Sequence, residues 1–245
     1  MPLIQAHRGA SGYAPENTLP AFRRAVELNA DGIETDIYLT ADGHLAVCHD
    51  PDISRTSNGS GVITEMTMES LRRFDFGSWY SPEFAGTVIP SLPEVLELVR
   101  HMDVINIEIK DMGPAGSAAR REAFALLLRQ LKEAGCVERT LISSFHHSLL
   151  KELKEAIPAL RTGLLYGDPF TPEETIAMVR SFDADAIHPY IGCLTESVAE
   201  ACRKRRIDIN AWTINDPENV RRALSLGVTG IITNLPDRVR QVMEG

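Results

Sequence analysis

The sequence lacks several features that define whole classes of protein. Its four cysteines, Cys48, Cys136, Cys193 and Cys202, form no CxxC pair, which argues against a structural zinc site and favours reduced thiols. No hydrophobic run is long enough to cross a bilayer, and the first residues lack the charged and apolar regions of a signal peptide. We therefore expect a cytoplasmic protein without stable membrane association.

Positive charge is also scarce. The chain has 25 lysines and arginines against 34 aspartates and glutamates, a formal net charge of -9 at pH 7. A nucleic-acid-binding surface is not expected, because basic side chains that neutralise phosphates supply most of that affinity. An acidic protein that handles an anionic substrate must reverse its field locally, and a bound cation does so. The charge balance therefore directs attention to a metal site.

Short apolar runs alternate with longer amphipathic ones along the 245 residues. Buried parallel strands read as nearly continuous apolar runs, and helices read as amphipathic repeats. The predicted strands cover residues 3–6, 32–39, 45–48, 104–109, 141–145, 162–166, 186–189, 209–213 and 230–233. The predicted helices cover residues 18–28, 68–74, 91–99, 118–134, 148–156, 172–181, 195–204, 217–225 and 236–243.

The alternation predicts the fold class. If the run at 45–48 is an excursion of the second unit, eight strand–helix units remain, which predicts an α/β fold of the TIM (β/α)8 barrel type. An open doubly wound sheet is the alternative, but residues 7–12 are a poor glycine-rich phosphate turn. Residues 51–89, rich in glycine, serine, proline and aromatics, break the alternation. We interpret them as a small insertion within a single domain of residues 1–245.

Polar residues and one tryptophan gather at the carboxyl ends of the predicted strands. They are His7, Arg8, Glu34, Asp36, His49, Glu108, Lys110, Ser143, Ser144, His188, Trp212, Thr233 and Asn234. In a barrel these strand ends converge on the face where active sites are built. We therefore expect the functional site on that face.

Three carboxylates in this set are candidate metal ligands. Glu34 and Asp36 are two residues apart, so their side chains point the same way from a strand. Such a pair repels at neutral pH unless a cation lies between them. Glu108 supplies a third oxygen donor, and oxygen ligands suit Mg²⁺, Ca²⁺ and Mn²⁺ alike. Strand-end acids paired only with Arg8 or Lys110 are the alternative interpretation.

Two histidines and two basic residues suit phosphodiester cleavage. The reaction needs a base for the attacking oxygen and an acid for the leaving oxygen, and His7 and His49 could serve either role. Arg8 and Lys110 would bring positive charge to a phosphate. Trp212 offers a flat apolar wall for a ligand. The alternatives are structural: a hydrogen-bonded histidine, basic side chains paired with carboxylates, or a core tryptophan.

These residues and the segments around them resemble the glycerophosphodiester phosphodiesterase family, most of all its compact bacterial cytosolic members. The resemblance runs in order through His7-Arg8-Gly9, Pro15-Glu16-Asn17-Thr18, Glu34-x-Asp36, His49-Asp50, Arg55-Thr56, Phe76-Gly77, Ile89-Pro90, Glu108-x-Lys110, Ser143-Ser144-Phe145, Trp212-Thr213 and Thr233-Asn234-x-Pro236. Each piece alone is weak, but the ordered set is specific. The chain departs from the pattern at His188-Pro189, where asparagine is more usual, so the role of His188 stays open.

The resemblance implies metal-dependent hydrolysis of glycerophosphodiesters, such as glycerophosphocholine and glycerophosphoethanolamine, to sn-glycerol 3-phosphate and an alcohol. It implies a TIM barrel with a small inserted region and a place in lipid and glycerol metabolism. It also implies metal ligation by Glu34, Asp36 and Glu108, and acid–base catalysis by His7 and His49.

The resemblance further implies that Arg8 and Lys110 contact the phosphate and that Trp212 lies near the glycerol moiety. Glu16 and Asn17 would be supporting or helix-capping groups. The glycerol 2-hydroxyl would attack first, and water would then open a cyclic phosphate. The residues leave open which histidine is the base; the provisional assignment makes His7 the base and His49 the acid.

Two other functions are weighed against this one. A lysophospholipase D-like activity on lysolipids would favour an exposed apolar stripe or a membrane anchor, and the sequence shows neither. A non-catalytic phosphodiester-binding barrel would be marked by the loss of a histidine or carboxylate, and all five are present. The sequence does not indicate an oligomeric state.

Overall fold

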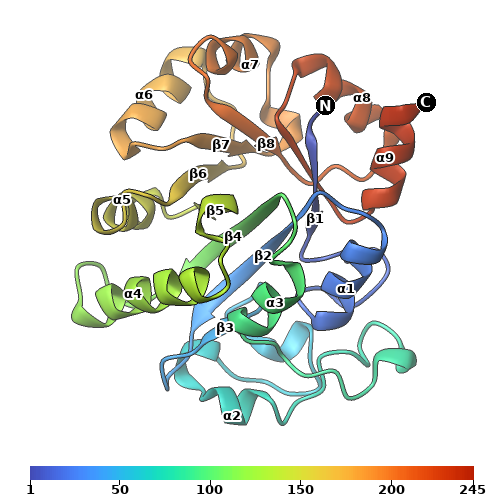
Figure 1. Ribbon diagram of the computed structural model, residues 1–245, viewed down its shortest axis with the longest axis vertical. Helices are drawn as coiled ribbons and strands as arrows, with labels where there is room; N and C mark the ends of the chain where they lie inside the picture. The colour runs from blue at the N-terminus through green and yellow to red at the C-terminus, as the bar shows by residue number, and fades with distance from the viewer.

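The computed structural model of the protein describes residues 1–245, and its centre is a ring of parallel strands (Figure 1). The strands of the ring are β1 (Leu3–His7), β2 (Gly32–Leu39), β4 (Val104–Asp111), β5 (Thr140–Ser144), β6 (Arg161–Tyr166), β7 (Ala186–Pro189), β8 (Asp208–Ala211) and β9 (Gly230–Thr233). Each pairs with its neighbours in this order, and β1 also pairs with β9, which closes the ring. The predicted TIM barrel is confirmed.

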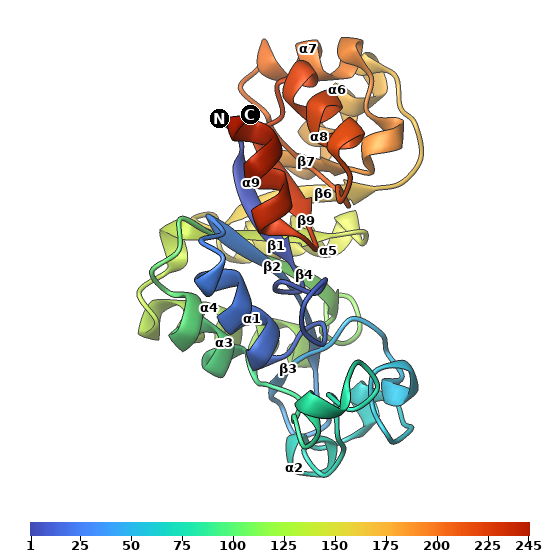
Figure 2. The same ribbon diagram turned by 90° about the vertical axis from the view of Figure 1, so that its right-hand side faces the viewer.

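Helices follow the strands and cover the outside of the barrel (Figures 1 and 2). They are α1 (Leu19–Glu27), α3 (Leu92–Val99), α4 (Ala118–Glu133), α5 (His147–Ala156), α6 (Pro172–Phe182), α7 (Glu196–Arg203), α8 (Pro217–Leu226) and α9 (Pro236–Glu244). Side chains of Ser117, Thr171, Thr195 and Asp216 accept a backbone N–H in the first turns of α4, α6, α7 and α8. These caps satisfy donors that have no partner within the helix.

The excursion after β2 carries the segment of residues 51–89, which we call the inserted segment. β3 (Leu45–Val47) lies outside the ring, as predicted for the excursion, and it pairs antiparallel with β2. The inserted segment holds one short helix, α2 (Met68–Leu71), and three 3₁₀ turns, at Ile53–Arg55, Ile63–Glu65 and Pro82–Phe84. Figure 1 places it at one end of the molecule, next to β3.

The inserted segment packs through a small apolar cluster, separate from the main core of 47 buried residues. The cluster joins side chains of the inserted segment to side chains around β2 and β3: Tyr38, Ala46, Cys48, Ile53, Ile63, Met68, Leu71, Phe76 and Ile89. Burial of apolar side chains on both sides of this junction fixes the inserted segment to the β2–β3 hairpin.

The barrel interior contains a buried polar network. Gln5 Nε2 donates to Asn210 Oδ1 at 2.9 Å, and Asn210 Nδ2 donates to His188 Nε2 at 3.0 Å. A Cβ atom at Gly163 would come within 2.4 Å of His188 Nε2, so only glycine leaves room for this imidazole. Burial lowers the pKa of His188 to about 3, which keeps it neutral. The structure therefore places His188 in the interior network.

Two predicted strands of the ring are too long at their carboxyl ends, and the predicted strand 45–48 outside the ring ends one residue earlier, at Val47. β5 ends at Ser144 and β8 at Ala211, whereas the apolar runs continue to Phe145 and Thr213. Trp212 continues β8 only as an isolated bridge to Tyr190, because Ile191 N donates to its carbonyl. The aromatic residues at these strand ends belong to loops that line the mouth of the barrel, which an apolar run alone cannot distinguish from a strand.

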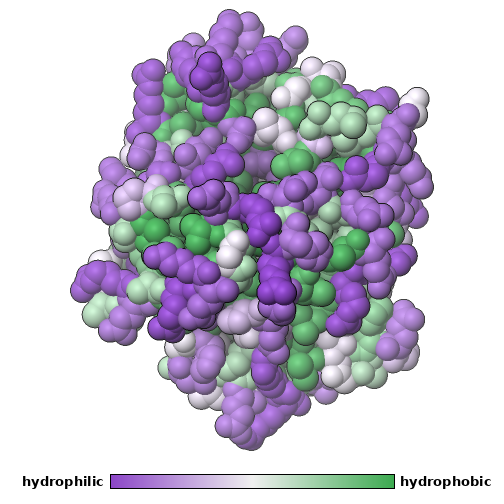
Figure 3. Space-filling model, in the orientation of Figure 1, coloured by the Kyte–Doolittle hydropathy of each residue, from purple (hydrophilic) through white to green (hydrophobic).

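The surface is largely hydrophilic on the face shown in Figure 3, with hydrophobic residues in separate small patches. None of the helices is both long and apolar enough for a bilayer crossing.

Candidate active site

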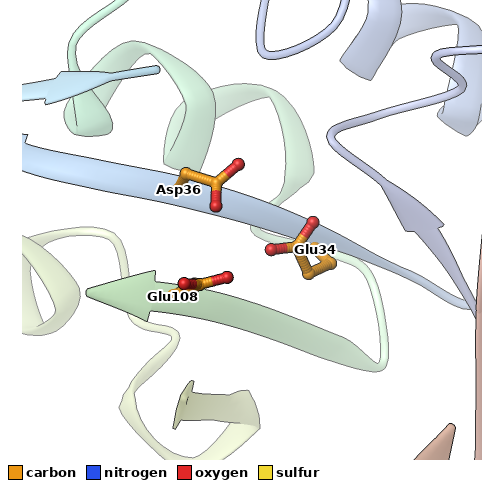
Figure 4. A group of neighbouring side chains, drawn as sticks. All are labelled: Glu34, Asp36 and Glu108. Atoms are coloured by element: carbon orange, nitrogen blue, oxygen red, sulfur yellow. The ribbon is translucent and has the colours of Figure 1, made fainter. Parts of the chain in front are cut away.

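Three buried carboxylates meet at the mouth of the barrel. Glu34 and Asp36 come from β2 and Glu108 from β4, and their side chains point toward one another (Figure 4). The parallel register pairs Asp36 with Glu108, which brings the acids of two strands to one height. One oxygen of each carboxylate lies within 4.8 Å of one oxygen of each other carboxylate. The sequence spacing predicts this convergence correctly.

The electrostatics of this acidic triad favour a bound cation. Burial and the charges of Asp36 and Glu108 raise the pKa of Glu34 well above its ordinary value. Burial and Asp36 also raise the pKa of Glu108, to about 7. Negative charge therefore exceeds what the surrounding basic groups neutralise. Three buried oxygen donors with surplus negative charge fit a hard divalent cation.

Two basic side chains contact the triad. Lys110 Nζ lies 2.6 Å from Glu108 Oε1 and 3.2 Å from Asp36 Oδ1, and Arg8 Nε lies 3.5 Å from Asp36 Oδ2. Burial opposes ionisation of Asp36, but Lys110 and Arg8 lower its pKa to about 2. Asp36 and Glu108 are thus paired with basic side chains, which is the alternative that the sequence left open. The negative charge of Glu34 has no such partner among the side chains of Lys110 and Arg8.

Both histidines are held through Nδ1. His7 Nδ1 donates to Asn234 Oδ1 at 2.7 Å, and His49 Nδ1 donates to Asp50 Oδ1 at 2.6 Å. Burial lowers the pKa of His7 to about 4 and lowers that of His49 as well. Each imidazole is therefore neutral near pH 7, with a lone pair on Nε2. His7 Nε2 lies 3.9 Å from Glu34 Oε2.

A turn after β1 places Arg8 beside the triad. Its backbone φ is 56°, in the left-handed region that residues other than glycine rarely adopt. The backbone N–H of Arg8 donates to Glu34 Oε2 at 3.1 Å, and its Nη1 donates to Glu16 Oε1 at 2.9 Å. The buried Asn17 Nδ2 donates to Asp36 Oδ2 at 2.7 Å. Glu16 and Asn17 thus contact Arg8 and Asp36, which is one of the two roles that the family resemblance implies for them.

These groups surround a cavity of about 190 Å³. Its 12 lining residues are His7, Arg8, Glu34, His49, Asn106, Glu108, Ser143, Phe145, Leu165, Trp212, Thr213 and Ile232. Of the eight residues with a predicted catalytic, metal or substrate role, all but Asp36 and Lys110 line the cavity, and Lys110 contacts both Asp36 and Glu108. Of the other strand-end polar residues, Ser143 lines the cavity, whereas Ser144, His188, Thr233 and Asn234 do not. Trp212 and Phe145 pack edge to face, with ring centroids 5.8 Å apart, and form an apolar wall.

Several lining residues lie outside the sequence-predicted set. Asn106 precedes Glu108 by two positions, so the period of two along a strand signals its shared face. Its Oδ1 accepts from Ser143 Oγ at 2.9 Å. Leu165 and Ile232 resemble ordinary core residues in the sequence, and no local pattern marks them as lining a cavity.

Fold and site together define the class of protein: a (β/α)8-barrel enzyme with three converging buried carboxylates beside two neutral histidines. The model of the glycerophosphoryl diester phosphodiesterase family matches residues 7–238. A glycerophosphodiester phosphodiesterase of Caldanaerobacter subterraneus subsp. tengcongensis is 40% identical over 236 residues, which is 96% of this chain and 95% of that protein. The enzyme of that name from Bacillus altitudinis is 36% identical, over 100% of this chain and 99% of its own length.

Solved structures agree. A phosphodiesterase of Oleispira antarctica, determined in complex with the product sn-glycerol-3-phosphate, has a TM-score of 0.89 and 26% identity, over 100% of this chain and 98% of that chain. A glycerophosphodiester phosphodiesterase of Thermotoga maritima has a TM-score of 0.79 and 29% identity, over 99% and 98%. The chain belongs to the glycerophosphoryl diester phosphodiesterase family and is an enzyme of the phosphoric diester hydrolase class.

Proposed function

We propose that this enzyme hydrolyses glycerophosphodiesters, such as glycerophosphocholine and glycerophosphoethanolamine, to sn-glycerol 3-phosphate and an alcohol, in a metal-dependent reaction. The observation that carries the proposal is one small cavity lined by both an acidic cluster and two histidines with free Nε2 atoms. The bound product in the Oleispira antarctica phosphodiesterase supports the glycerol 3-phosphate half of the substrate.

Glu34, Asp36 and Glu108 would hold Ca²⁺, Mg²⁺ or Mn²⁺. When bound, the cation supplies positive charge to the phosphate and lowers the pKa of a nearby hydroxyl. The raised pKa values of Glu34 and Glu108 support this role, because burial and the charges of neighbouring carboxylates cause them and a divalent cation relieves the repulsion.

His7 would be the base and His49 the acid. The Nε2 lone pair of His7 takes the proton of the attacking glycerol 2-hydroxyl, while Asn234 holds the opposite ring nitrogen. The hydroxyl oxygen bonds to phosphorus, and His49 protonates the alcohol oxygen as its bond to phosphorus breaks. For this step His49 must first take up a proton on Nε2, against the lowering of its pKa by burial, and the hydrogen bond from Nδ1 to Asp50 favours that protonated form. Water then opens the resulting cyclic phosphate to give glycerol 3-phosphate: His49, now neutral, takes a proton from the water as its oxygen bonds to phosphorus, and His7 returns its proton to the departing 2-oxygen.

Arg8 and Lys110 would provide fixed positive charge for the phosphate, and Trp212 an apolar contact for glycerol carbons. Arg8 lines the cavity directly, whereas Lys110 acts beside Glu108.

We propose that the chain is one domain with residues 51–89 as an insertion. The four free cysteines support the proposed cytoplasmic location, where thiols stay reduced.

A product analysis with three substrates tests the proposal. The purified protein is incubated with divalent cation and glycerophosphocholine, glycerophosphoethanolamine or lysophosphatidylcholine, and the phosphorus-containing products are resolved by ³¹P NMR. We expect glycerol 3-phosphate from the first two substrates. Lysophosphatidate from the third substrate alone would favour a lysophospholipase D-like activity, and no product from any of them would favour a non-catalytic barrel.

A further inference from the structure

Arg55 of the inserted segment holds two carboxylates that belong to different parts of the barrel mouth. Its Nε donates to Asp50 Oδ2, which follows β3. Its Nη1 and Nη2 donate to Glu16 Oε2 at 3.0 Å and Oε1 at 2.6 Å, in the loop between β1 and α1. One guanidinium thus joins two acids that are 34 positions apart in the chain.

Each of these acids holds one group that lines the cavity. Asp50 accepts the Nδ1–H of His49 at 2.6 Å, and Glu16 accepts from Nη1 of Arg8 at 2.9 Å. A continuous chain of charged contacts therefore runs from His49 through Asp50, Arg55 and Glu16 to Arg8. No hydrogen bond joins Arg55 directly to His49 or Arg8, so the hydrogen-bonded connection between them runs through the two acids.

We infer that Arg55 is a positioning residue for His49 and Arg8. It fixes the orientation of Asp50 and Glu16, and these acids in turn direct His49 Nε2 and the Arg8 guanidinium at the substrate. The inference rests on the proposed function. Arginine suits the role because its planar fork serves two carboxylates at once, whereas the ammonium group of lysine is a point charge.

A purely structural role predicts different behaviour. The side chain of Arg55 is 46% exposed, and exposed ion pairs contribute little to stability. Arg72 provides a matched control within the inserted segment. It is 39% exposed and pairs with Glu94 of α3, and neither partner lines the cavity. Both arginines tie the inserted segment to the barrel, but only Arg55 is linked to His49.

The experiment compares Arg55→Gln, Arg55→Lys and Arg72→Gln with the wild type on two glycerophosphodiesters. One releases choline, and the other releases a nitrophenol, whose anion departs without protonation and does not need a general acid. For the choline substrate, we expect Arg55→Gln to lower kcat about tenfold, part of the roughly 100- to 10,000-fold that acid–base catalysis contributes. For the nitrophenol substrate, the loss of kcat should stay below about twofold, because this leaving group needs no proton from His49.

The remaining variants separate the effect of Arg55 on His49, through Asp50, from its effect on Arg8, through Glu16. Arg55→Lys should recover part of the lost kcat, and Arg72→Gln should match the wild type. Asp50→Asn should reproduce the dependence on leaving group, whereas Glu16→Gln should raise KM for both substrates, because Arg8 holds the phosphate. Melting temperatures of the Arg55 and Arg72 variants should agree closely.

Three outcomes decide the matter. An Arg55→Gln enzyme with wild-type kinetics, or with equal losses of kcat on the two substrates, would overturn the positioning role. A wild-type enzyme inactive on both substrates would instead refute the proposed function.

Discussion

Replacement of Glu108 by glutamine should stabilise the metal-free protein while it removes much of the response to divalent cations. Burial and Asp36 raise the pKa of Glu108 from 4.5 to about 7, and this value already includes the attraction of Lys110. Each tenfold change in an acid dissociation constant corresponds to about 1.4 kcal/mol. The charged Glu108 side chain therefore destabilises the folded, metal-free protein by roughly 3 kcal/mol at pH 8.

The sign of the pH dependence follows from the same carboxyl. Its pKa is higher in the folded than in the unfolded protein, so the folded protein binds the proton more tightly. The contribution of Glu108 to the free energy of unfolding of the metal-free wild type should therefore fall as the pH rises from 4.5 to about 7, so the difference from Glu108→Gln should grow over this range. Asp36, whose pKa is lowered to about 2, contributes stability that is lost only at lower pH.

Urea unfolding of the stripped wild type and Glu108→Gln at several pH values tests this prediction. We expect the variant to be more stable by about 1–3 kcal/mol at pH 8 and equal to the wild type near pH 4.5. A divalent cation at 100 times its dissociation constant should add about 2.7 kcal/mol to the wild type and much less to the variant. A variant that is less stable at pH 8, or as strongly stabilised by cation, would refute the reasoning.

Three further predictions concern other parts of the molecule. Replacement of His7 or His49 by alanine should lower kcat on glycerophosphocholine by roughly 100- to 10,000-fold. The rise in Tm that a divalent cation causes should persist in both variants. Loss of that rise would show that the imidazole belongs to the cation site. Gly230→Ala should lower the free energy of unfolding by about 1–3 kcal/mol in urea titration, because its Cβ would lie 2.0 Å from Asn210 Oδ1; an unchanged midpoint would contradict the buried network. Trp212→Ala should raise KM for glycerophosphocholine more than it lowers kcat, because the proposed contact of the apolar wall with glycerol would form before and during reaction. An unchanged KM in steady-state assays would remove Trp212 from the substrate site.

The barrel can be predicted from the sequence because each strand is marked by a short stretch of consecutive residues. Apolar runs identify the strands, and the side chains at their carboxyl ends converge in any closed parallel barrel. For the same reason Glu34, Asp36 and Glu108 could be grouped before their positions were known. A spacing of two fixes the first pair, and the neighbouring strand brings the third carboxylate to the same height.

The rest depends on contacts that no local pattern records. Glu16 and Arg55 are 39 positions apart and meet only because the inserted segment packs on the β2–β3 hairpin. Lys110 has the spacing of a cavity residue, but its ammonium group turns to Asp36 and Glu108 and stays off the cavity surface.

The most direct test of the central claim is the release of sn-glycerol 3-phosphate from glycerophosphocholine by metal-stripped enzyme, measured before and after each divalent cation is added back. The proposed function predicts no release from the stripped enzyme and recovery with at least one of Ca²⁺, Mg²⁺ and Mn²⁺. Release that continues unchanged after thorough stripping would contradict the role of the acidic triad. No release with any of these cations would contradict the proposed activity itself.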